Sequence, residues 1–275
     1  MSPVVQLPKS RPALMGIVNV TPDSFSDGGV HFRPEDAIAA GLRMADEGAD
    51  LIDVGGESTR PGAAAVPAGE ELGRVIPVVE ALARRGVAVS IDTMKPEVAR
   101  AALDAGARIV NDVTAFSHPE MASIAAATGC TVCLMHMKGD PRTMQRDPTY
   151  VDVVREVRDY LAERAAFAES SGVAREAIWI DPGIGFGKTV RHNLLLLKHL
   201  ESFVRTGYPV LIGVSRKSFI GRILNPENPV TVEERLEGTL AAQVIAQIKG
   251  VRILRVHDVK QARRALEVVA AIEGA

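Results

Sequence analysis

Polar and ionisable residues follow each of the eight short apolar runs in this sequence. In chain order they are Asn19, Asp53, Asp92 with Thr93, Asn111 with Asp112, Met135 with His136, Asp181, Ser215 with Arg216 and Lys217, and Arg255 with His257. One polar residue after a strand usually ends the strand or begins a turn, but the same placement after eight strands indicates a shared site. The carboxylates of Asp53, Asp92 and Asp181 would need hydrogen-bond donors facing them. With Asn111, which can donate and accept, they suit a flat heterocycle that has an amidine-like N–H edge.

Two other groups of residues are suited to binding anions. Arg255 and His257 are two residues apart, so in a strand their side chains point the same way and can gather an anion. The segment that begins at Gly213 leads into a short helical pattern with Ser218 in its first turn, and a helix N-terminus binds anions. The sequence therefore predicts a carboxylate-lined slot and two separate anion sites.

Several familiar motifs are incomplete in this chain. Residues 183–189 are similar to the end of a P-loop and to a dinucleotide fingerprint, but Pro182 and Lys188 replace glycines that those motifs require. Residues 213–217 lack the last glycine of a nucleophile elbow. Cys130 and Cys133 have no second pair, so we expect buried small hydrophobic residues rather than a metal or redox site. We therefore expect chemistry that needs no protein nucleophile.

The apolar runs predict eight strands, each followed by a helical pattern. We expect strands at 13–18, 50–54, 87–91, 108–111, 131–134, 178–181, 210–213 and 253–256, and helices near 34–48, 68–85, 96–105, 119–128, 150–171, 190–205, 233–249 and 258–273. Most strands are continuously apolar, as in strands covered on both faces. Eight such repeats predict an α/β fold in which residues 1–275 form one domain, a closed (β/α)8 or TIM barrel. The alternative is a doubly wound sheet, which usually has five or six strands.

Two connections are long for loops between a strand and a helix. One runs from Asn19 to about Arg33, and the other covers about 55–67. Both are rich in Gly, Pro, Ser, Thr and Asp, so we expect mobile lids at the catalytic face. A tolerated insertion is the alternative for either loop. Thr231 and Glu234 also form a capping-box pattern at the start of the helix near 233–249.

The composition limits the class of protein. The chain has 275 residues, of which 47% are apolar and 24% charged, which is ordinary for a globular domain. Its formal net charge of −2 gives no basic field to recruit nucleic acid. No apolar run approaches the roughly 18 residues of a membrane span, and the first residues do not resemble a signal peptide. We expect a soluble cytoplasmic protein with no nucleic-acid or membrane partner.

Motifs spread over nearly the whole chain resemble those of dihydropteroate synthases, in the pterin-binding enzyme family. Residues 16–28 (GIVNVTPDSFSDG), within a segment of 12–30 that includes the first loop, are similar to the first signature. Residues 52–62 (IDVGGESTRPG) are similar to the second signature. Shorter matches in the same order are SIDT at 90–93, NDV at 111–113, LMHM at 134–137, DPGIGFGK at 181–188, SRKS at 215–218 and RVHD at 255–258.

The resemblance implies a transferase of folate biosynthesis and a set of site residues. Such an enzyme joins 6-hydroxymethyl-7,8-dihydropterin pyrophosphate to p-aminobenzoate and releases 7,8-dihydropteroate and pyrophosphate. The implied substrate-binding residues are Phe25, Thr59, Pro61, Asp92, Asn111, Met135, Asp181, Phe186, Lys217, Ser218, Arg255 and His257. The implied catalytic residues are Asp27, Arg60, Lys217, Arg255 and His257, and Asn19 is the implied Mg²⁺ ligand. A homodimer and competition by sulfonamides are also implied.

Within this set, the resemblance assigns a role to each end of the site. Asp92, Asn111, Asp181 and Lys217 would hold the pterin. Arg255 and His257 would bind the pyrophosphate, with Thr59 near it and Arg60 alongside. Phe186, Pro61 and the stem of Lys217 would enclose the aminobenzoate ring, whose carboxylate would lie on Ser218. Phe25 and Asp27 would belong to the closing first loop.

Two other functions are possible for a chain of this fold, and each predicts different residues at these motif positions. A pterin-dependent methyltransferase of the same barrel family should lack the TRPG segment at 59–62 and the pair of Arg255 and His257, which are both present. A non-catalytic pterin-binding paralogue would be expected to lose metal or lid residues, but Asn19, Asp27 and Arg60 are retained.

Overall fold

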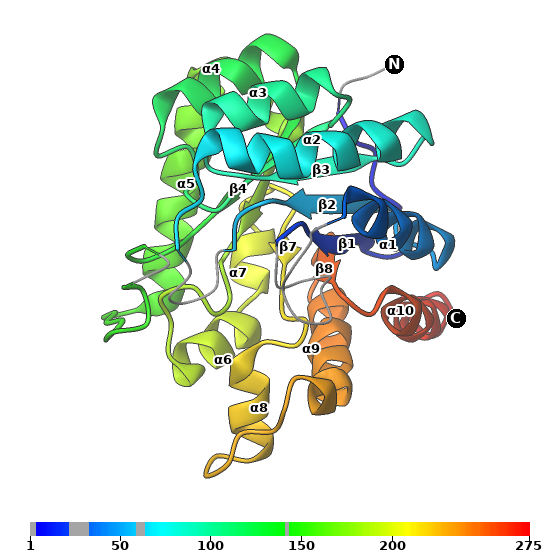
Figure 1. The fold of residues 1–275 in the computed structure, drawn as a ribbon. Helices are drawn as coiled ribbons and strands as arrows, with labels where there is room; N and C mark the ends of the chain where they lie inside the picture. The colour runs from blue at the N-terminus through cyan, green and yellow to red at the C-terminus, as the bar shows by residue number, and fades with distance from the viewer. Residues whose placement is uncertain (1–3, 22–32, 59–63, 141–142) are drawn as a thin grey trace.

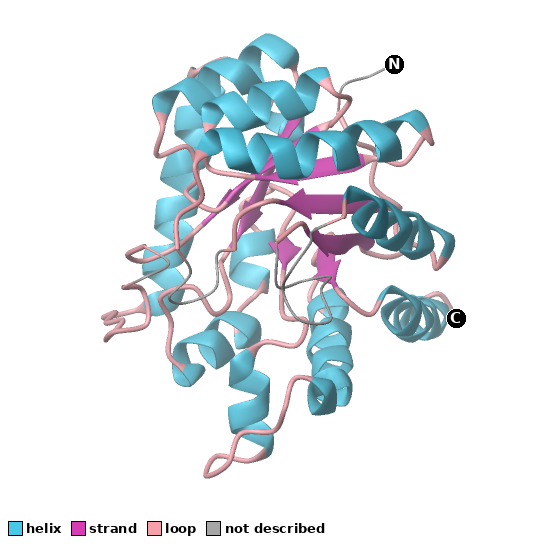
Figure 2. Cartoon of the chain, in the orientation of Figure 1, coloured by secondary structure: helices cyan, strands magenta, loops and turns pink. Residues whose placement is uncertain are grey.

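The structure, a computed structural model, describes residues 4–21, 33–58, 64–140 and 143–275. Within these residues, helices surround a central set of parallel strands (Figure 1, Figure 2). The strands are β1 (Ala13–Asn19), β2 (Leu51–Gly55), β3 (Val89–Asp92), β4 (Ile109–Asp112), β5 (Thr131–Met135), β6 (Ile178–Asp181), β7 (Leu211–Ile212) and β8 (Ile253–Val256). The α-helices are α1 (Pro34–Asp46), α2 (Ala68–Arg84), α3 (Pro96–Asp104), α4 (Pro119–Thr128), α5 (Val153–Ser170), α6 (Val190–Lys198), α7 (Glu201–Val204), α8 (Ser218–Leu224), α9 (Leu236–Ile248) and α10 (Val259–Glu273).

The strands form a barrel rather than an open, doubly wound sheet. Their order is β6-β5-β4-β3-β2-β1-β8-β7, and every pair is parallel. The gap between β6 and β7 is bridged by a parallel pairing of Ile180 with Val210, and the N–H of Ile180 donates to the carbonyl of Pro209 at 3.0 Å. The predicted (β/α)8 fold is therefore confirmed.

Apolar side chains fill two separate layers. Leu14 and Val18 of β1 belong to the large cluster between the strands and the helices, whereas Met15 belongs to a smaller interior cluster with Trp179. This division follows from the alternation of side chains along a strand. Both cysteines are free and buried as expected, and burial raises the pKa of each thiol.

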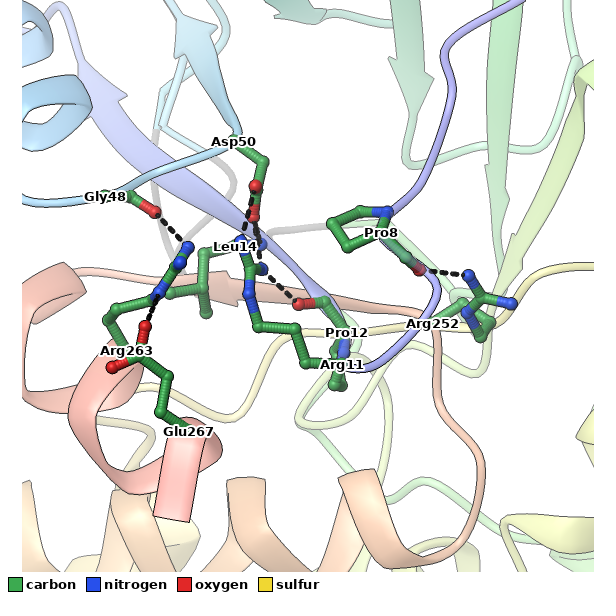
Figure 3. A network of polar contacts seen from close by, with 9 residues as sticks. All are labelled: Pro8, Arg11, Pro12, Leu14, Gly48, Asp50, Arg252, Arg263 and Glu267. Atoms are coloured by element: carbon green, nitrogen blue, oxygen red, sulfur yellow. Dashed lines mark hydrogen bonds and ion pairs between the residues drawn. The ribbon is translucent and has the colours of Figure 1, made fainter. Parts of the chain in front are cut away.

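The N-terminal segment covers the amino ends of the strands. Val5 and Leu7 pack against the interior cluster, and Arg252 donates to the carbonyl of Pro8 at 2.6 Å. Both guanidinium arms of Arg11 bind the Asp50 carboxylate, at 2.7 and 2.8 Å (Figure 3). This end of the barrel is thus occupied by the chain itself, and the carboxyl ends of the strands remain for a site.

Some predicted elements differ from those observed. The helix expected near 190–205 is divided into α6 and α7, and β7 is only two residues long. Helix α5 begins at Val153, where Asp152 caps it, so residues 136–152, of which 141–142 are not described, connect β5 to α5. This connection is also long, but it is not one of the two that the sequence singles out. The capping box at Thr231 and Glu234 is incomplete. The Glu234 carboxylate accepts from Thr231, but a short 3-10 turn precedes α9.

No helix in the described part of the chain is both long enough and apolar enough to span a membrane.

Candidate active site

A pocket lies at the carboxyl ends of the strands, the end of a barrel where active sites form. Its lining comes from β1, β3, β4, β5, β6 and β8 and from the loops that follow the strands. The lining residues are Ile17, Asp92, Asn111, Val113, Met135, Asp181, Phe186, Gly213, Ser215, Lys217, Arg255 and His257. Polar groups that are far apart in the sequence therefore meet in one place.

The residues implied by the family resemblance fall into three groups. Those that line the pocket are Asp92, Asn111, Met135, Asp181, Phe186, Lys217, Arg255 and His257. Asn19 is half-buried at the end of β1, and Ser218 is exposed at the first residue of α8. Phe25, Asp27, Thr59, Arg60 and Pro61 lie outside the described residues.

Two apolar lining residues, Ile17 and Val113, were not predicted. The alternation of β1 could have identified Ile17, because it lies two residues from the inward-facing Met15. Val113 follows β4 directly and has no comparable periodic signal.

Arg255 is held between two carboxylates. Its Nε donates to Oδ2 of Asp53 at 2.6 Å, and one terminal nitrogen donates to Oδ2 of Asp92 at 2.9 Å. The guanidinium of Arg255 therefore lies beside the carboxylates of Asp53 and Asp92, and its expected role in binding an anion stays a prediction. Burial raises the pKa of Asp92, and the positive charge of Arg255 opposes that rise.

Asp53 is not among the residues that line the pocket, which corrects the expectation that it lines the slot. Its side chain is fully buried, and its Oδ2 also accepts from Nδ2 of Asn111 at 3.2 Å. Asp53 therefore orients both Asn111 and Arg255. The amide oxygen of Asn111 remains available to accept a hydrogen bond from a ligand.

Asp181 and Lys217 both line the pocket. One oxygen of the buried Asp181 carboxylate accepts from the N–H of Gly183 at 2.7 Å. The Lys217 ammonium donates to the carbonyl of Ile184 and lies 4.5 Å from the centre of the Phe186 ring. Burial lowers the pKa of Lys217 to about 8, and the negative charge of Asp181 opposes that change. This side of the pocket offers a carboxylate, a cation and an aromatic face.

The turn after β7 is fixed by Arg216. This residue has a left-handed backbone (φ 57°), which is uncommon for a residue other than glycine. Its N–H donates to Oγ1 of Thr239 at 3.0 Å, and its Nε donates to Asp258 at 2.9 Å. Ser215, on one side of it, contacts Nδ1 of His257 at 3.0 Å. The turn thus delivers Ser215 and Lys217 to the same pocket.

The described residues have one feature suited to a weakly held Mg²⁺ ion. Among them there is no group of three or more His, Cys, Asp or Glu side chains that could hold a metal. Asn19 supplies a neutral oxygen at the end of β1, and Mg²⁺ commonly binds through few protein ligands together with water and substrate phosphates. The donor set therefore fits an ion that arrives with an anionic substrate.

Comparisons with known proteins agree on one family. The model of the family described as "Pterin binding enzyme" matches residues 15–257. The curated dihydropteroate synthase of Escherichia coli (strain K12) is 53% identical over 263 residues, which cover 95% of this chain and 92% of the relative.

Solved structures give the same result. The Xanthomonas albilineans dihydropteroate synthase with 4-aminobenzoic acid has a TM-score of 0.90 and 49% identity, covering 96% of this chain and 94% of that one. The Yersinia pestis dihydropteroate synthase in a sulfonamide drug complex has a TM-score of 0.92 and 46% identity, with 98% of both chains covered. This chain belongs to the pterin-binding enzyme family and, within it, to the dihydropteroate synthases.

Proposed function

We propose that this chain condenses 6-hydroxymethyl-7,8-dihydropterin pyrophosphate with p-aminobenzoate, and that the reaction occurs in the pocket at the carboxyl ends of the strands. The observation that carries the proposal is the meeting of three kinds of group in this one pocket. They are hydrogen-bonding groups for a heterocycle, a cation stacked on an aromatic ring, and an arginine with histidine for a phosphate.

The pterin is proposed to bind against Asp181 and Asn111. Asp181 uses one oxygen to accept from Gly183, which leaves the other to accept from the N–H edge of the pterin. Asn111 is oriented by Asp53 and can accept a further hydrogen bond. Asp92 is the register partner of Asn111 in the adjacent strand and extends the same edge.

Arg255 and His257 are proposed to bind the leaving pyrophosphate. Asp53 and Asp92 engage Nε and one terminal nitrogen of Arg255, so other N–H groups of its five remain for phosphate oxygens. The two carboxylates also fix the guanidinium in advance, which favours stabilisation of charge that develops in the transition state.

Asn19 would hold Mg²⁺ together with the substrate, because it supplies an oxygen ligand at the end of β1. When bound, this ion would neutralise part of the charge on the pyrophosphate. The protein's own contribution is Arg255 and His257, which act on the same leaving group.

The p-aminobenzoate ring is proposed to be enclosed by Phe186, Pro61 and the stem of Lys217, with its carboxylate near Ser218. Thr59, Arg60, Phe25 and Asp27 are proposed to complete the site from the two long loops. The stacking of Lys217 on Phe186 supports this assignment, because it forms an apolar face beside a charge. Sulfonamides are proposed to compete for the same position.

The reaction needs no protein nucleophile. The electron-rich dihydropterin can stabilise a cation at its exocyclic carbon as the C–O bond breaks and pyrophosphate leaves. The aniline nitrogen then attacks as a neutral amine, and the proton that it loses can pass to the departing pyrophosphate. Residues that cover the pocket would keep water from that carbon. The side chains of the chain therefore bind, orient and stabilise charge.

We also propose that the chain is a cytoplasmic homodimer. Exposed apolar side chains on neighbouring helices support a second copy as the covering partner: Ile245 and Ile248 on α9, and Val268 and Ile272 on α10. Light scattering of the intact protein tests the oligomeric state.

A coupled assay of pyrophosphate release tests the function. We expect release only when the pterin pyrophosphate and p-aminobenzoate are both present. Release without p-aminobenzoate would indicate a hydrolase, and pterin binding without release would favour the non-catalytic paralogue. Methyl transfer from a methylated tetrahydrofolate would favour the related methyltransferase.

A further inference from the structure

Side chains donate hydrogen bonds to four consecutive backbone carbonyls in the loop that carries Phe186. The pairs are Lys217 with Ile184, Gln145 with Gly185 (2.5 Å), Lys188 with Phe186 (2.9 Å) and Tyr150 with Gly187 (2.9 Å). Gln145 and Tyr150 belong to the connection of residues 136–152 after β5. The loop is therefore attached to two neighbouring loops instead of being free to move by itself.

Two glycines let this loop lie directly on the connection after β5. Gly183 and Gly187 have positive φ angles of 67° and 62°. A Cβ atom on Gly183 would lie 1.9 Å from the carbonyl oxygen of His136, and one on Gly187 would lie 2.4 Å from that of Lys138. Any other residue would separate the two backbones, so the close contact is a built feature of the sequence.

Lys188 lies at the centre of this contact. It is only 3% exposed, and its Nζ lies 3.0 Å from Nδ1 of His136, 3.3 Å from the His136 carbonyl and 2.9 Å from the Phe186 carbonyl. These three acceptors equal the number of N–H donors of an ammonium group. Burial, with the positive charge of Lys188, lowers the pKa of His136 to about 3, so the ring is neutral and its Nδ1 can accept.

The Lys188 ammonium has no carboxylate in ion-pair contact within the described part of the chain. Burial lowers the pKa of Lys188 well below its usual value, and a buried amine or ammonium group is costly unless its hydrogen bonds are satisfied. Its acceptors come from both loops, so they are all available only when the loop of Phe186 lies in this one position on the connection after β5. The hydrogen bonds of the buried Lys188 thereby favour a single placement of the Phe186 backbone.

We propose that Lys188 is a positioning residue for p-aminobenzoate. It acts through the Phe186 carbonyl and fixes the Phe186 ring against Lys217. This proposal rests on the proposed function, because it takes Phe186 to contact the aminobenzoate ring. Lys188 itself does not line the pocket, so its effect must pass through Phe186.

The test is a comparison of KM values in Lys188→Met. We expect the KM for p-aminobenzoate to rise by about 10-fold or more, since a small misplacement of a positioning group costs up to about 100-fold. The KM for the pterin pyrophosphate should stay within about 2-fold, because Asp181 and Asn111 keep their hydrogen bonds to Gly183 and Asp53. Lys249→Met is the matched control: this lysine pairs with Glu201 outside the site, and neither KM should change.

A double-mutant cycle with Phe186→Ala separates positioning from general stability. If Lys188 acts through Phe186, the double variant should have a KM for p-aminobenzoate less than about 2-fold higher than that of Phe186→Ala alone. Independent, multiplying effects would overturn the proposal, as would equal rises in both KM values. Lys188→Gln serves as a second variant because it keeps a polar side chain at this position. If neither Lys188 variant binds the pterin substrate, Lys188 is needed for folding and the proposal is wrong. A wild-type protein that forms no dihydropteroate would instead reject the proposed function.

Discussion

Arg255 connects the two ends of the proposed site. Its residue type and its place at the end of β8 could be predicted, but its contacts with Asp53 and Asp92 could not. A sequence pattern indicates which strand end carries a side chain, whereas the depth of that side chain in the barrel depends on strand register. Here Met15 of β1 is the register partner of Arg255, which places the guanidinium below the rim beside Asp53.

Replacement of Arg255 should affect the chemical step. Its contact with pyrophosphate should strengthen as negative charge develops, so Arg255→Ala is expected to lower kcat by about 100-fold or more. Steady-state kinetics at saturating substrates measures this change. An increase confined to KM would show that Arg255 contributes only to ground-state binding.

Asp181→Asn should affect binding of the pterin more than chemistry. The amide can still accept from Gly183 through its oxygen, but its NH2 group would then face the N–H edge of the pterin. We expect mainly a higher KM for the pterin substrate, since an interaction made equally in ground and transition states is lost. Loss of kcat at saturating pterin substrate would contradict this assignment.

The pH profile should report Lys217. Burial lowers its pKa to about 8 in the free protein, so the cationic form is present below that pH and lost above it. If the cation binds substrate, kcat/KM for p-aminobenzoate should fall as the pH rises through about 8, because this parameter reports the free enzyme. In Lys217→Arg, whose side chain stays protonated, this alkaline limb should disappear. A limb that persists in the variant would belong to another group.

At the scale of elements, clear apolar runs predict the bounds of several strands and helices correctly. The bounds of β6, β8 and α4 were those expected, because each is a clear run that ends at a turn or polar residue. β7 was shortened, since its pairing with β6 extends to a single bridge at Val210. The sequence does not single out the connection of residues 136–152, although the predicted strand at 131–134 and the predicted helix near 150–171 leave a long gap between them. Its contacts with the loop of Phe186 depend on backbone approach that no residue pattern indicates.

The cap of α5 should be measurable by itself. Asp152 accepts from the N–H groups of Val154 and Arg155, both at 3.1 Å. Asp152→Ala should reduce the free energy of unfolding by about 1 kcal/mol, the usual value for losing such a cap. Urea denaturation measures the change, with Asp159→Ala as the control, because Asp159 forms an exposed pair with Arg158, and such pairs contribute little to stability. Equal stability of the two variants would contradict the capping role.

At the scale of the whole molecule, the barrel separates stability from function. The N-terminal segment and the Arg11–Asp50 pair close one end of the strands, and the polar residues gather at the other. The repeat count predicted this architecture because eight similar strand–helix units have few other ways to bury their strands. The covering of the amino end was not predicted, since residues 4–12 show no periodic pattern.

In the proposed reaction, the bond between the exocyclic carbon and the bridging oxygen breaks to give a stabilised cation, which the aniline nitrogen then attacks. The most direct measurement uses a pterin pyrophosphate labelled with ¹⁸O in the bridge between that carbon and phosphorus. We predict that each dihydropteroate formed is accompanied by one pyrophosphate that carries the label. Label recovered in 6-hydroxymethyl-7,8-dihydropterin, with unlabelled pyrophosphate, would mean cleavage at phosphorus and would contradict the account.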